Sequence, residues 1–242
     1  DKRADRQVIP DGQAANRLAV YRDPGDAWDF NMDYAEQAPR TLELVSAAAR
    51  VDGPRAVLTQ VYRLAHSELT QEIALTVGSP RLDFISHLRW REPQTMLRTS
   101  FPVAVHAEDA TFEIQFGHIR RPTHRNTTWD LAKDEVAAHK WVDLSQRDYG
   151  VALLNDSKYG HKVKGNVIDL NLLRSVPYPG PRLVQDTDVA PGEPHHAYTD
   201  QCDHVFTYAL YPHPGDHVEG RVVQAGYALN VPLRVVPVAP QR

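Results

Sequence analysis

Residues 69–90 read LTQEIALTVGSPRLDFISHLRW, and this stretch decides the fold. Apolar and polar side chains alternate through residues 69–77 and again through residues 82–90. Successive side chains of a β-strand point to opposite faces, so each run presents one mainly apolar face to a core. The connection Gly78-Ser79-Pro80 is short, and it therefore predicts a β-hairpin.

Further short apolar runs predict more strands, and the alternation is clear from Leu42 onward. Residues 131–140 favour a helix by local propensity, but strand patterns flank them, so we expect a strand from about Glu135. We expect the proline-rich residues 176–196 to form a long loop. The other predicted strands cover residues 17–23, 97–105, 111–119, 150–155, 167–174, 205–211 and 229–235.

This pattern of about a dozen strands with almost no helix predicts an all-β fold. Strands with one apolar face are typical of two antiparallel sheets packed face to face. A chain of 242 residues is long enough to bury a sizeable core in one large β domain. We therefore predict a large antiparallel β-sandwich.

Composition excludes several classes of partner. The net charge of −4 offers no general attraction for nucleic acid or for an anionic membrane. No apolar run approaches the roughly 20 residues that a membrane-spanning helix needs. Cys202 is the only cysteine, so no intrachain disulfide can form, which fits a reducing compartment and predicts a cytoplasmic location. The first residue is Asp1 rather than methionine, and we expect the chain to be a fragment of a longer protein.

Three long motifs carry a resemblance to a known family. Residues 112–117 read FEIQFG and precede Arg121-Pro-Thr-His124, residues 139–145 read HKWVDLS, and residues 150–160 read GVALLNDSKYG. Together they closely resemble the C-terminal region of the α-mannosidases of glycoside hydrolase family 38, of the cytosolic and bacterial type. The resemblance extends in patches over nearly the whole chain.

The resemblance implies a fold of its own. It implies a large β-sandwich of the galactose-mutarotase-like type (a supersandwich) over residues 1–242. Residues 1–30 would be a lead-in segment, in which Trp28-Asp29 resembles the start of this region in the family. Residues 215–242 would be a small terminal β subdomain. We expect Trp28 to be a core or interdomain anchor.

The resemblance also implies a function for a longer protein. Enzymes of this family hydrolyse terminal α-mannosyl residues with retention, using zinc and a catalytic Asp in an N-terminal domain. We find none of those motifs here, so we expect no catalytic residue, no metal and no cofactor in this chain, and we expect it to be inactive alone. The implied partners are the N-terminal catalytic region of the same polypeptide, with which this chain would line the active-site cleft, and a mannose-containing oligosaccharide. A homo-oligomer stays open.

The polar turn at residues 155–160 holds three candidate substrate-facing residues. Tyr159 offers an aromatic face, which suits the C–H face of a pyranose ring. Lys158 and Asp156 can hydrogen-bond sugar hydroxyls or each other. Trp141, by contrast, lies within a predicted strand, and we expect it in the core.

Three further candidates come from the resemblance. Arg174 ends a Leu-Leu-Arg motif that the family keeps before a proline-rich loop, and Asp200 and His204 lie in a segment that resembles its Asp-x-Gly-x-His pattern. The resemblance implies that these loops approach the active site. Cys202 stands where glycine is usual, and it would strain the turn if that position needs a positive φ.

For two clusters of polar residues we prefer a structural role to a functional one. His213 and His217 have the spacing of a zinc site, but Pro214 and Gly215 lie between them, so we predict a turn with exposed histidines. The basic cluster of residues 120–125 is predicted to pin loops through arginine hydrogen bonds. Its candidate partners are Asp130, Asp134 and Glu135, and a sugar-facing role stays open.

Two other functions fit the same architecture. The second choice is a free-standing carbohydrate-binding β-sandwich, which monosaccharide binding by the lone chain, with no catalytic region encoded upstream, would favour. A mutarotase-like sugar epimerase needs a His and a Glu that converge in a sheet-lined cleft. Many histidines are present, but no motif selects such a pair.

Overall fold

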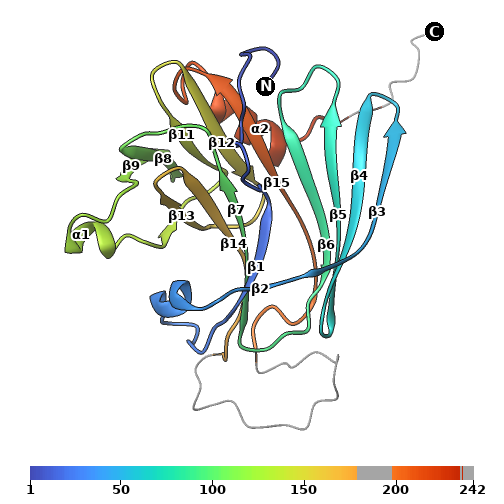
Figure 1. Cartoon of the computed structure of the whole chain (residues 1–242), viewed down its shortest axis with the longest axis vertical. Helices are drawn as coiled ribbons and strands as arrows, with labels where there is room; N and C mark the ends of the chain where they lie inside the picture. The colour runs from blue at the N-terminus through green and yellow to red at the C-terminus, as the bar shows by residue number, and fades with distance from the viewer. Residues whose placement is uncertain (179–197, 235, 237–242) are drawn as a thin grey trace.

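The alternating pattern of the sequence produces two antiparallel sheets in the part of the chain that the computed structural model describes, residues 1–178, 198–234 and 236 (Figure 1). The sheets pack against each other, which confirms the predicted all-β sandwich. Within the described residues, no helix is long and apolar enough to cross a membrane.

The larger sheet has nine strands and contains the hairpin that the sequence predicts. In that hairpin Leu75 pairs with Leu82 and Ile73 with Phe84. The order across the sheet is β3 (Glu43–Asp52), β4 (Arg55–Leu64), β5 (Ser67–Thr76), β6 (Leu82–Arg89), β15 (Asp203–Pro214), β12 (Tyr149–Asn155), β11 (Trp141–Ser145), β8 (Asp109–Ile114) and β9 (Gly117–Pro122).

The smaller sheet has six strands and packs against one face of the larger one, whose β3 edge it leaves uncovered (Figure 1). Its order is β10 (Val136–Ala137), β13 (Gly160–Lys164), β14 (Val167–Ser175), β7 (Thr95–Pro102), β1 (Arg17–Arg22) and β2 (Arg40–Thr41). The helices of the described residues are the 3-10 turn η1 (Met32–Glu36), α1 (Thr128–Leu131) and α2 (Val222–Asn230).

Two predicted strands are wrong. Residues 111–119 are not one strand, because the chain reverses between Ile114 and Gly117, which pair as the end of β8 and the start of β9. Residues 229–235 do not start as a strand, because α2 continues to Asn230. The spacing of Val222, Ala225 and Leu229 puts one apolar stripe on the outer face of β11 and β12, which is a helical pattern.

The predicted terminal β subdomain is therefore helical in its described part. Residues 215–234 contain a turn and α2 and hold no strand among the residues that the structure describes. The predicted long loop of residues 176–196 lies mostly outside the described residues, since only 176–178 fall within them.

The core lies between the two sheets and is centred on aromatic rings. The ring of Phe84 stacks on that of Tyr208 at 5.1 Å and meets Phe101 edge-on at 5.4 Å. Trp141 is 1% exposed, as predicted, but it belongs to a smaller cluster beneath α2. Trp28 is 81% exposed, so it does not lie in the core of this domain, and its role as an interdomain anchor stays a prediction.

A closed polar network crosses the core and joins the sheets. The Tyr208 hydroxyl donates to Asn16 Oδ1 at 2.6 Å and accepts from Gln71 Nε2 at 2.8 Å. Asn16 Nδ2 in turn donates to Gln71 Oε1 at 2.7 Å, and Thr99 Oγ1 donates to Asn16 Oδ1 at 3.0 Å. Buried polar groups stabilise a single arrangement when all their partners are present, so this network specifies how the sheets meet.

Candidate functional site

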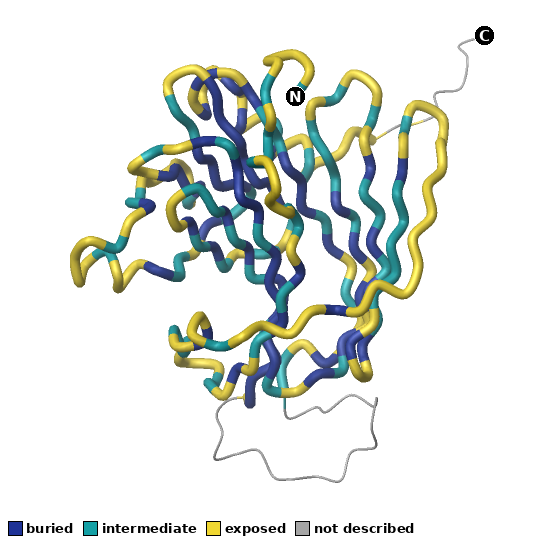
Figure 2. Tube along the Cα trace, in the orientation of Figure 1, coloured by how far each residue is buried: buried dark blue, intermediate teal, exposed yellow. Residues whose placement is uncertain are grey.

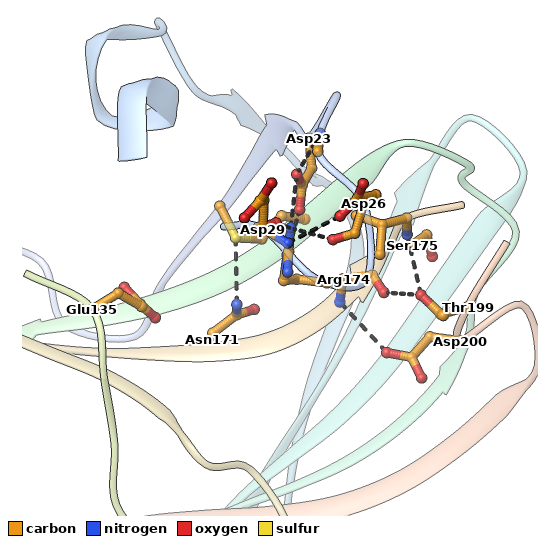
Figure 3. A network of polar contacts seen from close by, with 12 residues as sticks. Asp23, Asp26, Asp29, Glu135, Asn171, Arg174, Ser175, Thr199 and Asp200 are labelled. Atoms are coloured by element: carbon orange, nitrogen blue, oxygen red, sulfur yellow. Dashed lines mark hydrogen bonds and ion pairs between the residues drawn. The ribbon is translucent and has the colours of Figure 1, made fainter. Parts of the chain in front are cut away.

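Arg174 lies at the end of β14, and its guanidinium group binds the protein itself (Figure 3). Nε and Nη2 donate to the two carboxylate oxygens of Asp23 at 2.6 and 3.2 Å. Nη2 also donates to the carbonyl oxygens of Asp29 at 3.1 Å and Asp26 at 3.5 Å, and the group lies 4.7 Å from the ring centre of Phe30. Arg174 therefore holds residues 23–30 against the end of the sheet.

The backbone around Arg174 is fixed from the other side by residues 199 and 200 (Figure 3). Thr199 Oγ1 donates to the Arg174 carbonyl oxygen at 2.6 Å and accepts from the Val176 amide at 3.1 Å. The Arg174 amide makes a long 3.5 Å contact with Asp200 Oδ2. Arg174 and Asp200 are thus neighbours, as predicted, but the Arg174 side chain points away from Asp200.

Lys158 lies near two of the other candidates, Asp156 and Asp200, and His204 contacts Asp200. Its ammonium group lies 4.7 Å from the ring centre of Phe206. Burial lowers the pKa of Lys158 from its ordinary value, and the nearby carboxylates of Asp200 and Asp156 oppose that shift. His204 Nε2 contacts the Asp200 carbonyl oxygen at 2.9 Å. These residues form the Lys158 patch, which we define as Asp156, Lys158, Asp200 and His204.

Asp156 and Tyr159 differ in what they can offer a ligand. Asp156 Oδ2 accepts from the Thr207 amide at 2.9 Å, so this carboxylate fastens the turn to β15. Tyr159 is 54% exposed and lies outside the patch, with its ring edge-on to His139 at 5.6 Å. Of the six predicted residues, the structure groups four, leaves Tyr159 apart and uses the Arg174 side chain for its own fold.

The predicted strain at Cys202 does not occur. Among the described residues of this turn, the positive φ belongs to Asp200, at 59°, and not to Cys202. Cys202 is exposed, and its Sγ lies 3.4 Å from His204 Nε2. A side chain at position 202 is therefore compatible with the backbone of the turn.

Sequence reasoning missed a buried charge cluster on the outer face of the six-stranded sheet. Arg98 on β7 is 1% exposed, and it donates to Asp169 Oδ1 at 2.6 Å and to Glu135 Oε1 at 2.9 Å. Its guanidinium group also lies 5.0 Å from the ring centre of Tyr34 on η1. Arg98 follows the core-facing Leu97 in the strand, so its side chain points to the outer face of the sheet. An arginine within a predicted strand was the only sequence feature that could have indicated the cluster.

Burial shifts the ionisation of this cluster. It raises the pKa of Glu135 to about 7, although Arg98 opposes the shift, and it also raises the pKa of Asp169. Burial alone would lower the pKa of Arg98, but Asp169 and Glu135 outweigh it and raise that pKa above its ordinary value. Glu135 Oε2 has no hydrogen-bond partner among the described residues. Glu135 is thus a poorly satisfied carboxylate beside a permanent cation.

The predicted pinning of loops is confirmed for Arg125. Its Nε donates to Asp134 Oδ1 at 2.9 Å, and Lys162 reaches Asp134 Oδ2 at 2.6 Å. Burial of Asp134 opposes ionisation, but these two cations prevail and lower its pKa. Arg121 does something else, since its guanidinium group lies 4.7 Å from the ring centre of Phe112.

The predicted exposed position of His213 and His217 is wrong, because both are buried. His213 Nε2 lies 2.8 Å from Asp143 Oδ1, and Nδ1 lies 3.1 Å from the Pro214 carbonyl oxygen. His217 stacks on Trp141 at 5.6 Å. In the part of the chain that the structure describes, no group of three or more His, Cys, Asp or Glu side chains is arranged to hold a metal ion.

Known proteins resemble this chain closely in sequence. A family model described as "Glycosyl hydrolases family 38 C-terminal domain" matches residues 1–182. Alpha-mannosidase 2C1 of Mus musculus and that of Homo sapiens are each 39% identical over 241 residues, which is 96% of this chain and 21% of the relative. Alpha-mannosidase G of Dictyostelium discoideum is 38% identical over 242 residues. The chain therefore spans about a fifth of the length of these curated relatives.

Solved structures share the fold. An alpha-mannosidase from Enterococcus faecalis V583 superposes with a TM-score of 0.73 at 16% identity, over 90% of this chain and 28% of that one. A second Enterococcus faecalis protein of glycosyl hydrolase family 38 gives a TM-score of 0.72 at 15% identity. At such low identity these matches establish the β-sandwich architecture alone.

Replacing Arg174 tests its role in holding residues 23–30. Arg174→Gln leaves the Asp23 carboxylate, which is 4% exposed, without its cation. We expect the free energy of unfolding to fall by about 2–4 kcal/mol and amide exchange to rise within residues 24–31, as measured by urea unfolding and mass spectrometry. The double variant Asp23→Asn/Arg174→Gln removes both charges and should lose less. Unchanged exchange in the single variant would contradict this role.

The raised pKa of Glu135 predicts a pH-dependent stability. A folded-state value of about 7, above the ordinary 4.5, means that the folded chain holds the extra proton between these values. The proton on Glu135 stabilises the folded chain in full below pH 4.5, and this stabilisation is lost as the pH rises through 7. We expect the stability of Glu135→Gln relative to the unaltered chain to increase by on the order of 3 kcal/mol over this window, measured by urea unfolding. A flat difference would contradict the assignment.

Proposed function

The chain belongs to the C-terminal domain family of glycosyl hydrolases family 38, and from this we propose that it is the non-catalytic C-terminal part of a retaining α-mannosidase. One observation carries the proposal. The chain is 39% identical to enzymes named alpha-mannosidase over 96% of its own length, yet it spans only 21% of theirs. The remaining four-fifths leaves ample length for a catalytic region. The cytoplasmic location belongs to the same proposal.

The proposal places the hydrolytic chemistry outside the described residues. Zinc, which the family resemblance implies, finds no fitting set of donors in the described part of the chain. Several acidic side chains there already have partners: the buried Asp23 pairs with Arg174, the buried Asp143 with His213 and the partly buried Asp169 with Arg98. We therefore assign the zinc and the catalytic carboxylates to the N-terminal region of the same polypeptide.

An apolar sheet face supports docking of that N-terminal region. Paired residues form a row across the nine-stranded sheet, from Tyr208 and Phe84 in the core through Ile73 and Leu58 to Ala49 on β3. All ten residues of the edge strand β3 are exposed (Figure 2). The core-facing side of the larger sheet thus continues into solvent.

A groove marks this exposed part of the face. It has a volume of about 430 Å³, and its lining is mostly aliphatic. Its residues include Ala49, Val51, Leu58, Ile73, Leu75 and Leu82. Exposed apolar surface and an open strand edge are typical of interaction sites, and the length of chain that the relatives carry beyond this domain makes their N-terminal region the occupant we propose.

The Lys158 patch is the part of this domain that we propose to face the glycan. Lys158 supplies a cation, Asp200 a carboxylate and His204 an imidazole, and all three types of group hydrogen-bond hydroxyls. The Asp156 carboxylate supports the turn. We propose that this patch lines the cleft with the catalytic region and contacts a mannose-containing oligosaccharide, with Tyr159 nearby as a stacking surface.

The simplest test is hydrolysis of p-nitrophenyl α-D-mannopyranoside. We expect no turnover by the purified 242-residue chain and turnover by the complete polypeptide that contains it, because the catalytic groups would lie in the other region. Turnover by the chain alone would refute the proposal. Sugar binding by the chain, with a complete polypeptide that has no catalytic region, would favour a free-standing carbohydrate-binding module instead.

A second test addresses the apolar face. Val51 is 82% exposed on β3, so Val51→Asp should leave the stability of the isolated chain almost unchanged. In the complete polypeptide the same change would bury a charge, and we expect the temperature of half-inactivation to fall by on the order of 5 °C. Val218→Asp, at an exposed valine outside the groove, is the matched control. Equal behaviour of the two variants in the complete polypeptide would show that β3 is not the docking surface.

A further inference from the structure

A second pocket lies at the opposite end of the nine-stranded sheet from β3. It has a volume of about 480 Å³, within the range of about 300–1,000 Å³ that small-molecule sites occupy. Its walls are the β8–β9 hairpin, the start of β11 and helix α2. Its lining mixes aromatic, polar and aliphatic residues and includes Phe116, Trp141, Tyr227, Glu113, Lys140 and His118.

Phe116 has an unfavourable backbone conformation for a bulky residue and makes no packing contacts among the described residues that would offset it. It lies in the two-residue turn between Ile114 and Gly117, with a φ of 60°, where bulky side chains are disfavoured. Its ring is fully exposed, so it gains no packing within the described structure. The hairpin turn accounts for the positive φ, but it does not call for a phenylalanine at this position. An exposed aromatic ring at the rim of a pocket is available to cover a ligand.

The opposite wall is set by the close approach of α2 to β11. A Cβ atom on Gly226 would lie 3.0 Å from Trp141 Cδ1, so glycine allows the helix to approach the indole this closely. The helix then presents Tyr227, which is 50% exposed, to the pocket. Two aromatic rings, Phe116 and Tyr227, thus border the same space from different elements.

The polar groups of the pocket carry little net charge. Lys140 Nζ lies 3.1 Å from Glu113 Oε1 and 4.7 Å from the ring centre of Tyr227. The two ionic groups balance, so the pocket offers hydrogen bonds without attracting an ion of either sign. Gln115 and His118 add exposed polar side chains from the hairpin.

We propose that this pocket binds one neutral pyranose ring of a glycan, at a site separate from the Lys158 patch. The apolar C–H face of a pyranose suits an aromatic ring such as Phe116 or Tyr227. Its hydroxyl groups suit the ammonium group of Lys140 and the exposed side chains of Gln115 and His118. A charged ligand would find no net counter-charge, because Glu113 and Lys140 pair with each other. The choice of mannose as the sugar rests on the proposed function.

The test is a titration of the 242-residue chain with methyl α-D-mannopyranoside, with binding measured by saturation-transfer NMR. We expect saturable binding that Phe116→Gly weakens by about two- to tenfold, the effect of losing one aromatic contact. Glycine accepts the positive φ, so the melting temperature of this variant should stay level or rise. Tyr227→Ala should also weaken binding. Trp129→Ala, which removes an aromatic ring that is 79% exposed outside the pocket, should bind as the unaltered chain does.

Three results would overturn the proposal. They are the absence of saturable binding, equal binding by Phe116→Gly and the unaltered chain, and protection of residues 115–118 from amide exchange in the complete polypeptide but not in the isolated chain. The last would mean that the rest of the polypeptide covers the hairpin. None of these results bears on mannoside hydrolysis or on Val51→Asp, so the pocket and the proposed function can fail separately.

Discussion

The guanidinium group of Arg98 is the contact on which the outer face of the six-stranded sheet depends. It stands between two partly buried carboxylates, Asp169 of β14 and Glu135 just before β10, and close to the ring of Tyr34 on η1. Without this cation the two carboxylates would repel each other in a poorly solvated place. Arg98 therefore joins β7, β14, the start of β10 and the segment that covers them. Arg174 repeats the arrangement at the end of the sheet, where it holds Asp23.

Alternation predicted most strands because each sheet has one buried face, and the failures have identifiable causes. The reversal at residues 115–116 carries none of the usual turn residues except the following Gly117, so the sequence reads as one continuous strand. Helix α2 was not predicted because residues 229–235 alternate as a strand does, while the helical stripe of α2 consists of only Val222, Ala225 and Leu229. His213 was expected in an exposed turn, yet it lies at the end of β15, where Asp143 of β11 reaches it.

The sequence predicted which residues gather at the candidate site better than it predicted what each of them does. Asp156, Lys158, Asp200 and His204 do gather, although they come from two stretches more than 40 residues apart, since β12 and β15 are neighbours. Arg174 looks equally suited to a sugar in sequence, but its partner Asp23 lies 151 residues away. Pairing over such a distance leaves no local signal. A motif can therefore identify a functional arginine without showing whether the group meets a ligand or its own chain.

The two sheets differ in width, and this difference shapes the surfaces of the molecule. Six strands cannot cover nine, so the row from Tyr208 to Ala49 runs out of the core and meets solvent at β3. That end is apolar, and covering it would release free energy through the hydrophobic effect. At the other end α2 packs over β11 and β12, and the β8–β9 hairpin projects beside it. The surface there is a mixed aromatic and polar pocket, which suits a hydrated ligand better than a protein. A protein partner on β3 and a sugar near Phe116 can therefore bind one sheet without competing.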